Sequence, residues 1–485
     1  MKKILVTITM MFLSLFLINW SYHQRNTANM VNLEGCYATS TSLPFNTYSV
    51  YNLFDSNVDT NWKTMRGAGP DEGIMIYFDN PIKLGKLELI LLKEKECVSK
   101  GSGELFINGS KAGSFKFNDS NATFSFNGKS PSAVKSLYIK FADLEPAKQT
   151  SKKTIKKNAD YTDTINSTLT VFDKNYFVGL TEIRLYDKEG VRYNVMAPER
   201  ILGNITSSSI LDPKVSYAPE NLFDNQRGNA WAEGNPGIGV NEWLKFNFNS
   251  PVDMTAIKLW NGYQRSHKHY NDNARIQQLS FGVDNSTGVI YNVKDQKVAQ
   301  KIELKEKIKG KDFSLKIKAA FPGNKYQDLV LSELLFYNGI EPFIIENTNK
   351  EDAISQIIGN FKNTLMEKYL DRNIIIHEES AGGDGDRHLS FVLRSNQSFV
   401  IYDGVSSGSD GSTTIYEGNW EVVKQGLDKV EIRIFGKYFY TDNEDVLYKR
   451  KTEEQVSRVF QENLTFTKNK IKGQKVIEDI DVPNF

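Results

Sequence analysis

NLFDNQRGNAW occupies residues 221–231, and NLFDSNVDTNW occupies residues 52–62 of the same chain. Both stretches read Asn-Leu-Phe-Asp, then six variable residues, then tryptophan. The leucine and phenylalanine are expected to point into a core, and the tryptophan is large enough to close one end of it. A stretch that recurs in this form indicates an internal repeat, which has to be recognised before the fold is assigned.

Two further matches extend the repeat over most of each copy. A strand pair interrupted by a proline recurs at residues 73–90 and 242–260, and a closing strand recurs as LTEIRLYD from Leu180 and LSELLFYN from Leu331. Apolar residues alternate within these strands, which is typical of half-buried β-strands. We therefore predict two tandem β-sandwich units, at residues 36–190 and 197–343.

The composition supports a mainly β protein with several domains. At 485 residues the chain is too long for one core, and about 150 residues per domain predicts about three. The content of 22 Tyr, 29 Phe and 34 Gly favours sheets joined by turns. With 60 Lys and Arg against 59 Asp and Glu, no global field attracts nucleic acid or an anionic membrane. Specific recognition must therefore come from local sites.

The N-terminus predicts export. Lys2 and Lys3 precede an apolar run at residues 4–18, which is shorter than the ~20 residues of a spanning helix and is typical of a signal-peptide core. Residues 1–28 are thus a signal peptide or an uncleaved N-terminal anchor, and the mature chain is expected in the periplasm, the outer envelope or outside the cell. Cys36 and Cys97 predict one disulfide in such a compartment, and a lipidated Cys36 is the alternative.

The repeat resembles a known family. NLFD-x6-W at the start and LSELLFY at the end of the unit are similar to the discoidin, or galactose-binding-like, β-sandwich. The second unit resembles more narrowly the NADase-type glycan-binding domain of exported bacterial proteins, through its residues 229–248, 261–277 and 321–333. The first unit keeps the anchors but not the middle segment, so we interpret it as a divergent copy. The resemblance implies jelly-roll sandwiches and a glycan or glycoconjugate partner.

The resemblance also implies a structural Ca²⁺ in the loop that carries the aspartate. Discoidin-like modules often hold this ion with oxygen ligands, which Ca²⁺ prefers. The alternative is that the aspartate caps its own turn and the glutamate of the closing strand bonds loop amides, with no metal. Both interpretations stay open. The candidate ligands are Asp55, Thr60 and Glu182 in the first unit and Asp224, Asn229 and Glu333 in the second.

The segment NGYQRSHKHYNDNAR, at residues 261–275, is the best candidate for sugar recognition. It combines aromatic planes with amides and cations, and sugars need rings to stack on and groups that bond their hydroxyls. The alternative is that part of this set, about half, braces the loop. The predicted glycan-binding residues are Trp231, Glu233, Asn261, Tyr263, Arg265, His267, Tyr270, Asn273 and Arg275.

Residues 350–485 predict a small α+β domain with one helix and an antiparallel sheet or small barrel. Apolar residues at helical spacing predict a helix over 352–370, and strands are expected at 388–394, 398–402, 413–423 and 429–440. The basic segment at 148–158 is interpreted as a solvated surface loop.

We favour a non-catalytic, lectin-like envelope protein that binds glycan through the second unit. One alternative is an envelope enzyme with a site in residues 374–450, and another is a structural protein whose sandwiches bind other proteins. The residues that support the enzyme alternative are His377, Glu378, Glu379, Asp384, Asp386 and His388.

Overall fold

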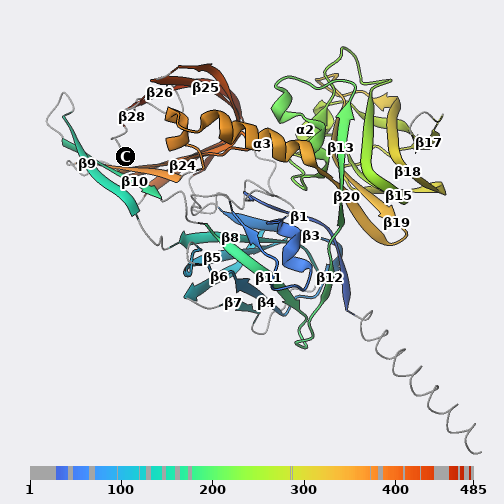
Figure 1. Ribbon diagram of the computed structural model, residues 1–485, viewed down its shortest axis with the longest axis horizontal. Coiled ribbons are helices and arrows are strands. Elements are labelled where there is room, and N and C mark those ends of the chain that lie inside the picture. The colour runs from blue at the N-terminus through green and yellow to red at the C-terminus, as the bar shows by residue number, and fades with distance from the viewer. Residues whose placement is uncertain are drawn as a thin grey trace, which may run out of the picture.

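The computed structural model describes residues 29–41, 47–64, 72–94, 97–118, 121–126, 133–144, 149–158, 164–172, 177–283, 286, 288–371, 373–380, 386–407, 410–426, 428–441, 458–467, 470–473 and 480–481. The predicted signal segment, residues 1–28, lies outside the described residues. The fold is mainly β, as predicted, and Figure 1 shows three bodies: two sandwiches and a C-terminal sheet with helix α3 (Thr348–Phe361) beside it.

The first sandwich packs a six-stranded sheet on a four-stranded one. Its core lies between the two sheets and includes Leu53, Trp62 and Phe141, all fully buried. The larger sheet has the order β12 (Asn194–Met196), β1 (Met30–Ala38), β3 (Gly73–Ile82), β8 (Val134–Leu144), β5 (Lys100–Ile107) and β6 (Ser110–Asn118). The smaller has the order β2 (Trp62–Lys63), β11 (Gly179–Tyr186), β4 (Lys86–Leu91) and β7 (Ala122–Ser125).

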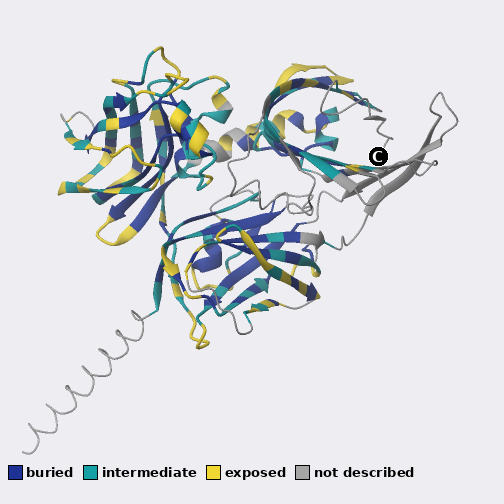
Figure 2. Cartoon of the chain, turned by 180° about the vertical axis from the view of Figure 1, so that it is seen from behind, coloured by how far each residue is buried: buried dark blue, intermediate teal, exposed yellow. Residues whose placement is uncertain are grey.

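The second sandwich is one sheet of eight strands whose long members bend around the core. The first half of β15 pairs with β13 and β18, and its second half pairs with β18 and β19. The phenylalanines Phe246, Phe281, Phe313 and Phe336 fill the centre. The order is β14 (Trp231–Ala232), β19 (Val330–Asn338), β20 (Glu341–Asn347), β13 (Glu199–Ser207), β15 (Trp243–Asn261), β18 (Gln300–Phe321), β16 (Arg275–Val283) and β17 (Val289–Asn292). Figure 2 shows the buried residues on the inner faces of both sandwiches.

The C-terminal sheet has ten strands, two of which come from inside the first unit. The segment interpreted as a basic loop at 148–158 is strand β9 (Gln149–Asn158), so that interpretation was wrong. It pairs with β10 (Thr164–Phe172), and β10 pairs with β21 (Asn373–Ser380). Figure 1 shows this hairpin at the end of the C-terminal sheet. A sheet edge accepts a strand of almost any composition through backbone hydrogen bonds, which apolar periodicity does not reveal.

Four of the other C-terminal strands, β22 to β25, match the predicted ones closely, and β26 to β28 were not predicted. These strands are β22 (Asp386–Leu393), β23 (Ser398–Ser407), β24 (Asp410–Gln425), β25 (Lys429–Thr441), β26 (Arg458–Thr467), β27 (Lys470–Lys472) and β28 (Ile480–Asp481). Helix α3 ends earlier than predicted, because Asn363 takes a left-handed conformation, and a 3-10 turn, η4 (Leu365–Lys368), follows. Trp420 and Phe361 pack together in the core of this domain.

The repeated NLFD stretch has the same structure in both sandwiches. It forms a 3-10 turn, η1 (Val50–Phe54) or η3 (Pro219–Phe223), and the asparagine side chain clamps the chain on both sides of that turn. Asn52 Nδ2 donates to the carbonyl oxygens of Thr47 and Asn61 at 2.8 and 2.9 Å. Asn221 Nδ2 donates to those of Ser216 and Ala230 at 2.9 and 3.0 Å. The asparagine therefore ties the turn to the residue before the buried tryptophan.

Both cysteines are free thiols in the structure, so the predicted disulfide is not formed. Cys36 is buried in β1 opposite Ile76, and burial raises the pKa of its thiol. Val31 and Leu33 precede it in the same strand and belong to the core. Processing at Cys36 would remove both, which argues against the lipidation alternative. Among the helices in the described ranges, none has the length and apolar character needed to cross a membrane.

A charged clasp joins the two sandwiches. Lys258 Nζ lies 2.8 Å from Glu34 Oε1 and 2.7 Å from Asp79 Oδ1, and its side chain is 12% exposed. Arg227 pairs with Glu34 and lies over the rings of Tyr77, from the first sandwich, and Trp260, from the second. Because both cations come from the second sandwich and both carboxylates from the first, the clasp fixes one domain against the other.

A second contact tightens this interface where Gly35 meets Asn225. Asn225 Nδ2 donates to the Tyr51 hydroxyl at 2.6 Å. A Cβ at position 35 would lie 1.7 Å from Asn225 Oδ1, so only glycine leaves room for this side chain. The close approach explains a glycine inside a strand.

Replacing the clasp ammonium tests this interface. We expect Lys258→Met to lower the free energy of unfolding by about 1–3 kcal/mol, because Glu34 and Asp79 lose a shared, largely buried counterion. Thermal melting and limited proteolysis between the sandwiches provide the measurement. Lys309→Met is the control, since its ammonium is 71% exposed and lies 4.0 Å from Asp253, and it should change little. Equal melting temperatures for the two variants would contradict the clasp.

Candidate functional site

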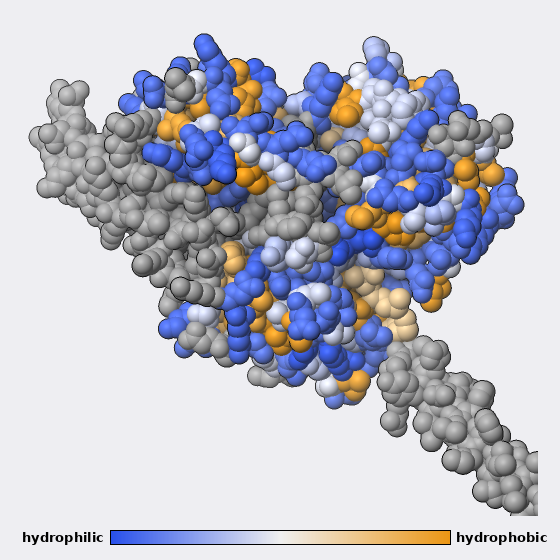
Figure 3. Space-filling model, in the orientation of Figure 1, coloured by the Kyte–Doolittle hydropathy of each residue, from blue (hydrophilic) through white to orange (hydrophobic). Residues whose placement is uncertain are grey.

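A cavity of about 1550 Å³ lies where the three domains meet. Its walls come from β1 and β3 of the first sandwich, from the loops around residues 210–229 and 260–265 of the second, and from β23 to β25 of the third domain. On the face drawn in Figure 3, hydrophilic residues predominate and apolar ones form small separate patches. Ligand sites are commonly concave, so this cavity is a candidate site.

The predicted glycan segment begins with a tightly bonded turn. Asn261 Nδ2 donates to the carbonyl oxygen of Ile276 at 2.8 Å, and Ile276 N donates to Asn261 Oδ1 at 2.9 Å. Gly262 has a φ of 71°, where a side chain would strike Tyr270 and Arg275. Ser266 then caps the short helix α2 (His267–Asp272), with its Oγ accepting from His269 N at 3.1 Å.

Arg275 holds the far end of the segment. Its Nε and Nη2 pair with both carboxylate oxygens of Asp295 at 2.7 and 2.8 Å. Its Nη1 donates to the carbonyl oxygens of Tyr270 and Asn273 at 3.1 and 2.8 Å, and the Tyr270 hydroxyl donates to Asp295. The side chains of Tyr270, Asn273 and Arg275 therefore hold the loop in shape, which corresponds to the bracing alternative.

The exposure of the predicted glycan-binding residues differs from the expectation. Trp231, Glu233 and Asn261 are fully buried, and Tyr270, Asn273 and Arg275 are nearly so. Trp231 Nε1 donates to Ser209 O, and the Glu233 carboxylate accepts from Asn235 N and Leu329 N. None of these six presents a surface to a ligand in this structure, because their polar groups are used inside the fold. His267 is exposed on α2.

Tyr263 and Arg265 are the predicted residues that line the cavity. The Arg265 guanidinium carbon lies 5.3 Å from the centre of the Tyr263 ring, and His269 packs edge-on against the same ring at 5.2 Å. Burial, reinforced by the Arg265 and Lys437 charges, lowers the pKa of His269 to about 4, so its ring is neutral at neutral pH. Tyr217 joins them, and burial raises the pKa of its hydroxyl to about 12.

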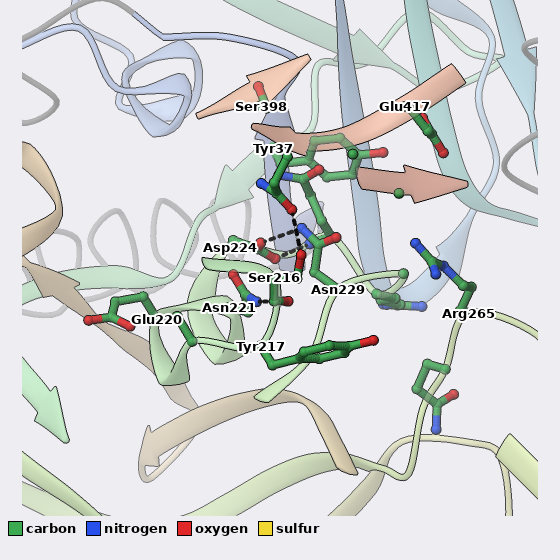
Figure 4. Close-up of a pocket in the computed structure, with 18 of the residues that line it drawn as sticks. Tyr37, Ser216, Tyr217, Glu220, Asn221, Asp224, Asn229, Arg265, Ser398 and Glu417 are labelled. Carbon is green, nitrogen blue, oxygen red and sulfur yellow. Dashed lines mark hydrogen bonds between the residues drawn. The ribbon is translucent and has the colours of Figure 1, made fainter. Parts of the chain in front are cut away.

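The opposite wall belongs to the third domain. Glu417 on β24 and Lys437 on β25 lie directly across from each other and form an ion pair of 2.8 Å. Ser216 Oγ donates to Asn419 Oδ1 at 2.9 Å and joins the two walls. Figure 4 shows Tyr217 and Arg265 on the second-sandwich side and Ser398 and Glu417 on the third domain. Sequence reasoning missed Tyr217, Glu417 and Lys437, since no motif links segments so far apart.

The candidate metal position of the first sandwich does not fit a cation. Asp55 caps its own turn, accepting from Asn57 N at 2.8 Å and from Thr60 Oγ1 at 2.7 Å. Glu182 is buried and pairs with Arg184 at 2.6 Å and Arg192 at 3.0 Å. Two guanidinium groups already neutralise the carboxylate that a metal would need.

The matching position of the second sandwich fits a cation better than the position in the first sandwich does. Asp224 accepts from Gln226 N at 2.7 Å and from Asn229 Nδ2 at 2.8 Å. Glu333 is buried beside Asp224, and within the described chain its Oε1 has no hydrogen-bond partner. Burial, and then the Asp224 charge, raise the pKa of Glu333 well above its usual range. Over the same part of the chain, no group of three or more His, Cys, Asp or Glu side chains gathers into a metal cage.

The candidate enzyme residues lie on adjacent strands of the third domain. His377 pairs with His388 across β21 and β22, and Glu379 pairs with Asp386. Asp384 lies outside the described residues. Arg387, next to His388, is held by both carboxylate oxygens of Asp403 at 2.8 and 3.0 Å.

The second sandwich is a discoidin-like domain. Residues 198–337 match the family model of the NAD glycohydrolase translocation F5/8 type C domain. No curated protein sequence matches the chain.

Several solved structures are similar to the chain at low identity. The CBM32-1, CBM32-2 and M60 catalytic domains of Clostridium perfringens ZmpB are 12% identical with a TM-score of 0.23, and the match covers 67% of this chain and 38% of that one. A fucolectin from striped bass (Morone saxatilis) serum is 12% identical with a TM-score of 0.22, covering 65% and 98%. Arabinofuranosyltransferase AftD from Mycobacteria is 9% identical with a TM-score of 0.26, covering 83% and 38%.

The Asp224–Glu333 pair predicts a pH dependence. A carboxyl with a raised folded-state pKa stabilises the fold fully below its unfolded value of about 4.5, and this stabilisation is lost as pH rises. Asp224 and Arg227 face Glu333, with Tyr51 and Tyr77 near it. In EDTA, we therefore expect Glu333→Gln to melt above the wild type at pH 8, and the difference to shrink towards pH 5.

If the second sandwich binds Ca²⁺, added Ca²⁺ should make the wild type melt above Glu333→Gln at pH 8. Added Ca²⁺ would then raise the melting temperature of the wild type at pH 8 but not that of Glu333→Gln. Glu182→Gln is the matched control in the first sandwich, and its melting temperature should stay insensitive to Ca²⁺. A wild type that melts above Glu333→Gln at pH 8 in EDTA would contradict the raised pKa.

Proposed function

We propose that this is an exported, non-catalytic protein that binds carbohydrate at the cavity where the second sandwich meets the third domain. The observation that carries the proposal is the lining at the loop end of the discoidin-like domain, where Tyr217, Tyr263 and Arg265 face the same cavity. Aromatic faces stack on the C–H side of a pyranose, while amides and guanidinium groups bond its hydroxyls.

The cavity offers both kinds of group. Tyr217 is half-buried, so one part of its ring is open to a ligand, while Tyr263 is buried deeper and supports Arg265. Gln264 and Asn419 supply amides from the two walls. Ligand pockets are commonly about 300–1,000 Å³, so a cavity of about 1550 Å³ has room for more than one sugar ring.

The third domain supports this site as its second wall. Ser216, in the loop that carries Tyr217, is bonded to Asn419, and β24 packs against the 3-10 turn η2 (Lys214–Ser216). The contact fixes the Tyr217 loop relative to Lys437 and Glu417. In this proposal residues 350–485 complete the binding site, which gives them a role that the family resemblance does not include.

Export and calcium belong to the same proposal. The apolar run at residues 4–18 after two lysines supports a signal peptide, and envelope glycans are then the accessible partners. Ca²⁺ would be held in the second sandwich by Asp224 and Glu333 with Asn229, where it would neutralise two adjacent carboxylates and fix the loop between η3 and β14.

A glycan array with the full chain tests the proposal. We expect selective binding by the wild type. Tyr217→Ala should lower the affinity at least about tenfold, because stacking of the tyrosine ring on a sugar ring supplies a large part of the binding free energy. Tyr291→Ala is the control: this half-buried tyrosine of β17 does not line the cavity and should bind normally. An array without any binding by the folded wild type would reject the proposal.

A further inference from the structure

Arg265 is a half-buried cation that has no anionic partner among the residues that the structure describes. Its Nε is buried and has no hydrogen-bond partner, and across the described chain no carboxylate lies within ion-pair distance of its guanidinium. Other arginines of the same sandwich differ, since Arg275 is paired with both oxygens of Asp295 and Arg227 with Glu34. A buried N–H group without a hydrogen-bond acceptor costs free energy, and a ligand that supplies an acceptor would remove this cost.

A second basic side chain, Lys437, lies beside Arg265. Burial, and then the Arg265 charge, lower the pKa of Lys437 well below its usual range. Glu417 is paired with Lys437 at 2.8 Å, so the charge of this carboxylate is already offset by that ammonium. Asp328 acts on Tyr217 but does not line the cavity. Among the described residues, the positive charge of Arg265 therefore has no carboxylate that balances it within ion-pair distance.

The wider lining of the cavity has a net positive charge. Basic side chains outnumber acidic ones, and three of the acidic residues are already used in pairs: Glu34 and Asp79 in the clasp and Glu417 with Lys437. Of the remaining basic residues, Lys297 is partly buried, and burial lowers its pKa. A concave, partly desolvated wall with a net positive charge attracts anionic ligands.

We propose that the ligand of this cavity is an acidic glycan, whose carboxylate or sulfate group binds the Arg265 guanidinium. This inference rests on the proposed function and specifies its ligand class. The planar guanidinium offers two parallel donors to a carboxylate or sulfate, and Tyr263 supports the plane from one side. The sugar ring attached to that group then extends along the cavity towards the half-buried Tyr217.

Paired ligands and one charge-removing variant test the inference. The probes are a uronic-acid oligosaccharide with its carboxyl-reduced form, and a sulfated oligosaccharide with its desulfated form, titrated calorimetrically into the full chain. We expect the wild type to bind an acidic member at least about tenfold more tightly than its neutral partner. The two pairs show whether the site takes carboxylate or sulfate.

Arg265→Gln should abolish that preference while neutral binding stays. Lys311→Gln removes one positive charge from an exposed position of the same sandwich outside the cavity, and it should keep the preference. Arg265→Lys retains the charge without the two-donor fork and should bind with intermediate affinity. If Arg265→Gln melts early, Arg265→Lys supplies the comparison in its place.

The binding experiments distinguish a failure of the acidic-ligand inference from a failure of the proposed function. Equal binding of acidic and neutral partners by the wild type, or an unchanged preference in Arg265→Gln, overturns the acidic-ligand inference and leaves glycan binding intact. No binding of any probe, together with a blank array, overturns the proposed function and this inference with it.

Discussion

The asparagine clamp inside each NLFD stretch is the interaction on which both sandwiches depend. One side-chain amide donates to two carbonyl oxygens on either side of a 3-10 turn, at Asn52 and again at Asn221. A carbonyl left unpaired in a partly buried loop costs about 1–3 kcal/mol, so the amide cannot be replaced by an apolar group of similar size. The clamp sets the entry of the next strand and places the tryptophan at the end of the core.

The clamp loop of the second sandwich also forms the interface with the first. Asn225 and Arg227 follow Asp224 in this loop and contact Tyr51, Tyr77 and Glu34 across the boundary. The same loop contributes Asp224 and Asn229 to the cavity wall. A single short segment thus stabilises its own domain, holds the neighbouring domain and shapes the site. Its charges are paired across the interface, which suits a fixed arrangement better than independent domains.

The candidate site is built from segments that lie far apart in the sequence. The second sandwich supplies Tyr217 and Arg265, and the third domain supplies Glu417 and Lys437. The hairpin β9–β10 shows the same feature at the level of the fold, because it leaves the first unit and pairs with β21. No local pattern encodes such a meeting, since backbone pairing at a sheet edge uses groups that every residue carries. The third domain is therefore joined to both sandwiches.

The sequence alone determined the two sandwiches, the mainly β class and four strands of the third domain, because alternating apolar residues and the NLFD-x6-W repeat act locally. It also singled out the 261–275 segment as unusual, although seven of the nine predicted glycan-binding residues are buried. Whether a polar or aromatic residue faces solvent or braces a loop is decided by partners distant in the chain, such as Asp295 for Arg275. Only the tertiary structure brought Arg265 next to Lys437 and left its guanidinium unpaired, because that depends on how three domains pack around one cavity.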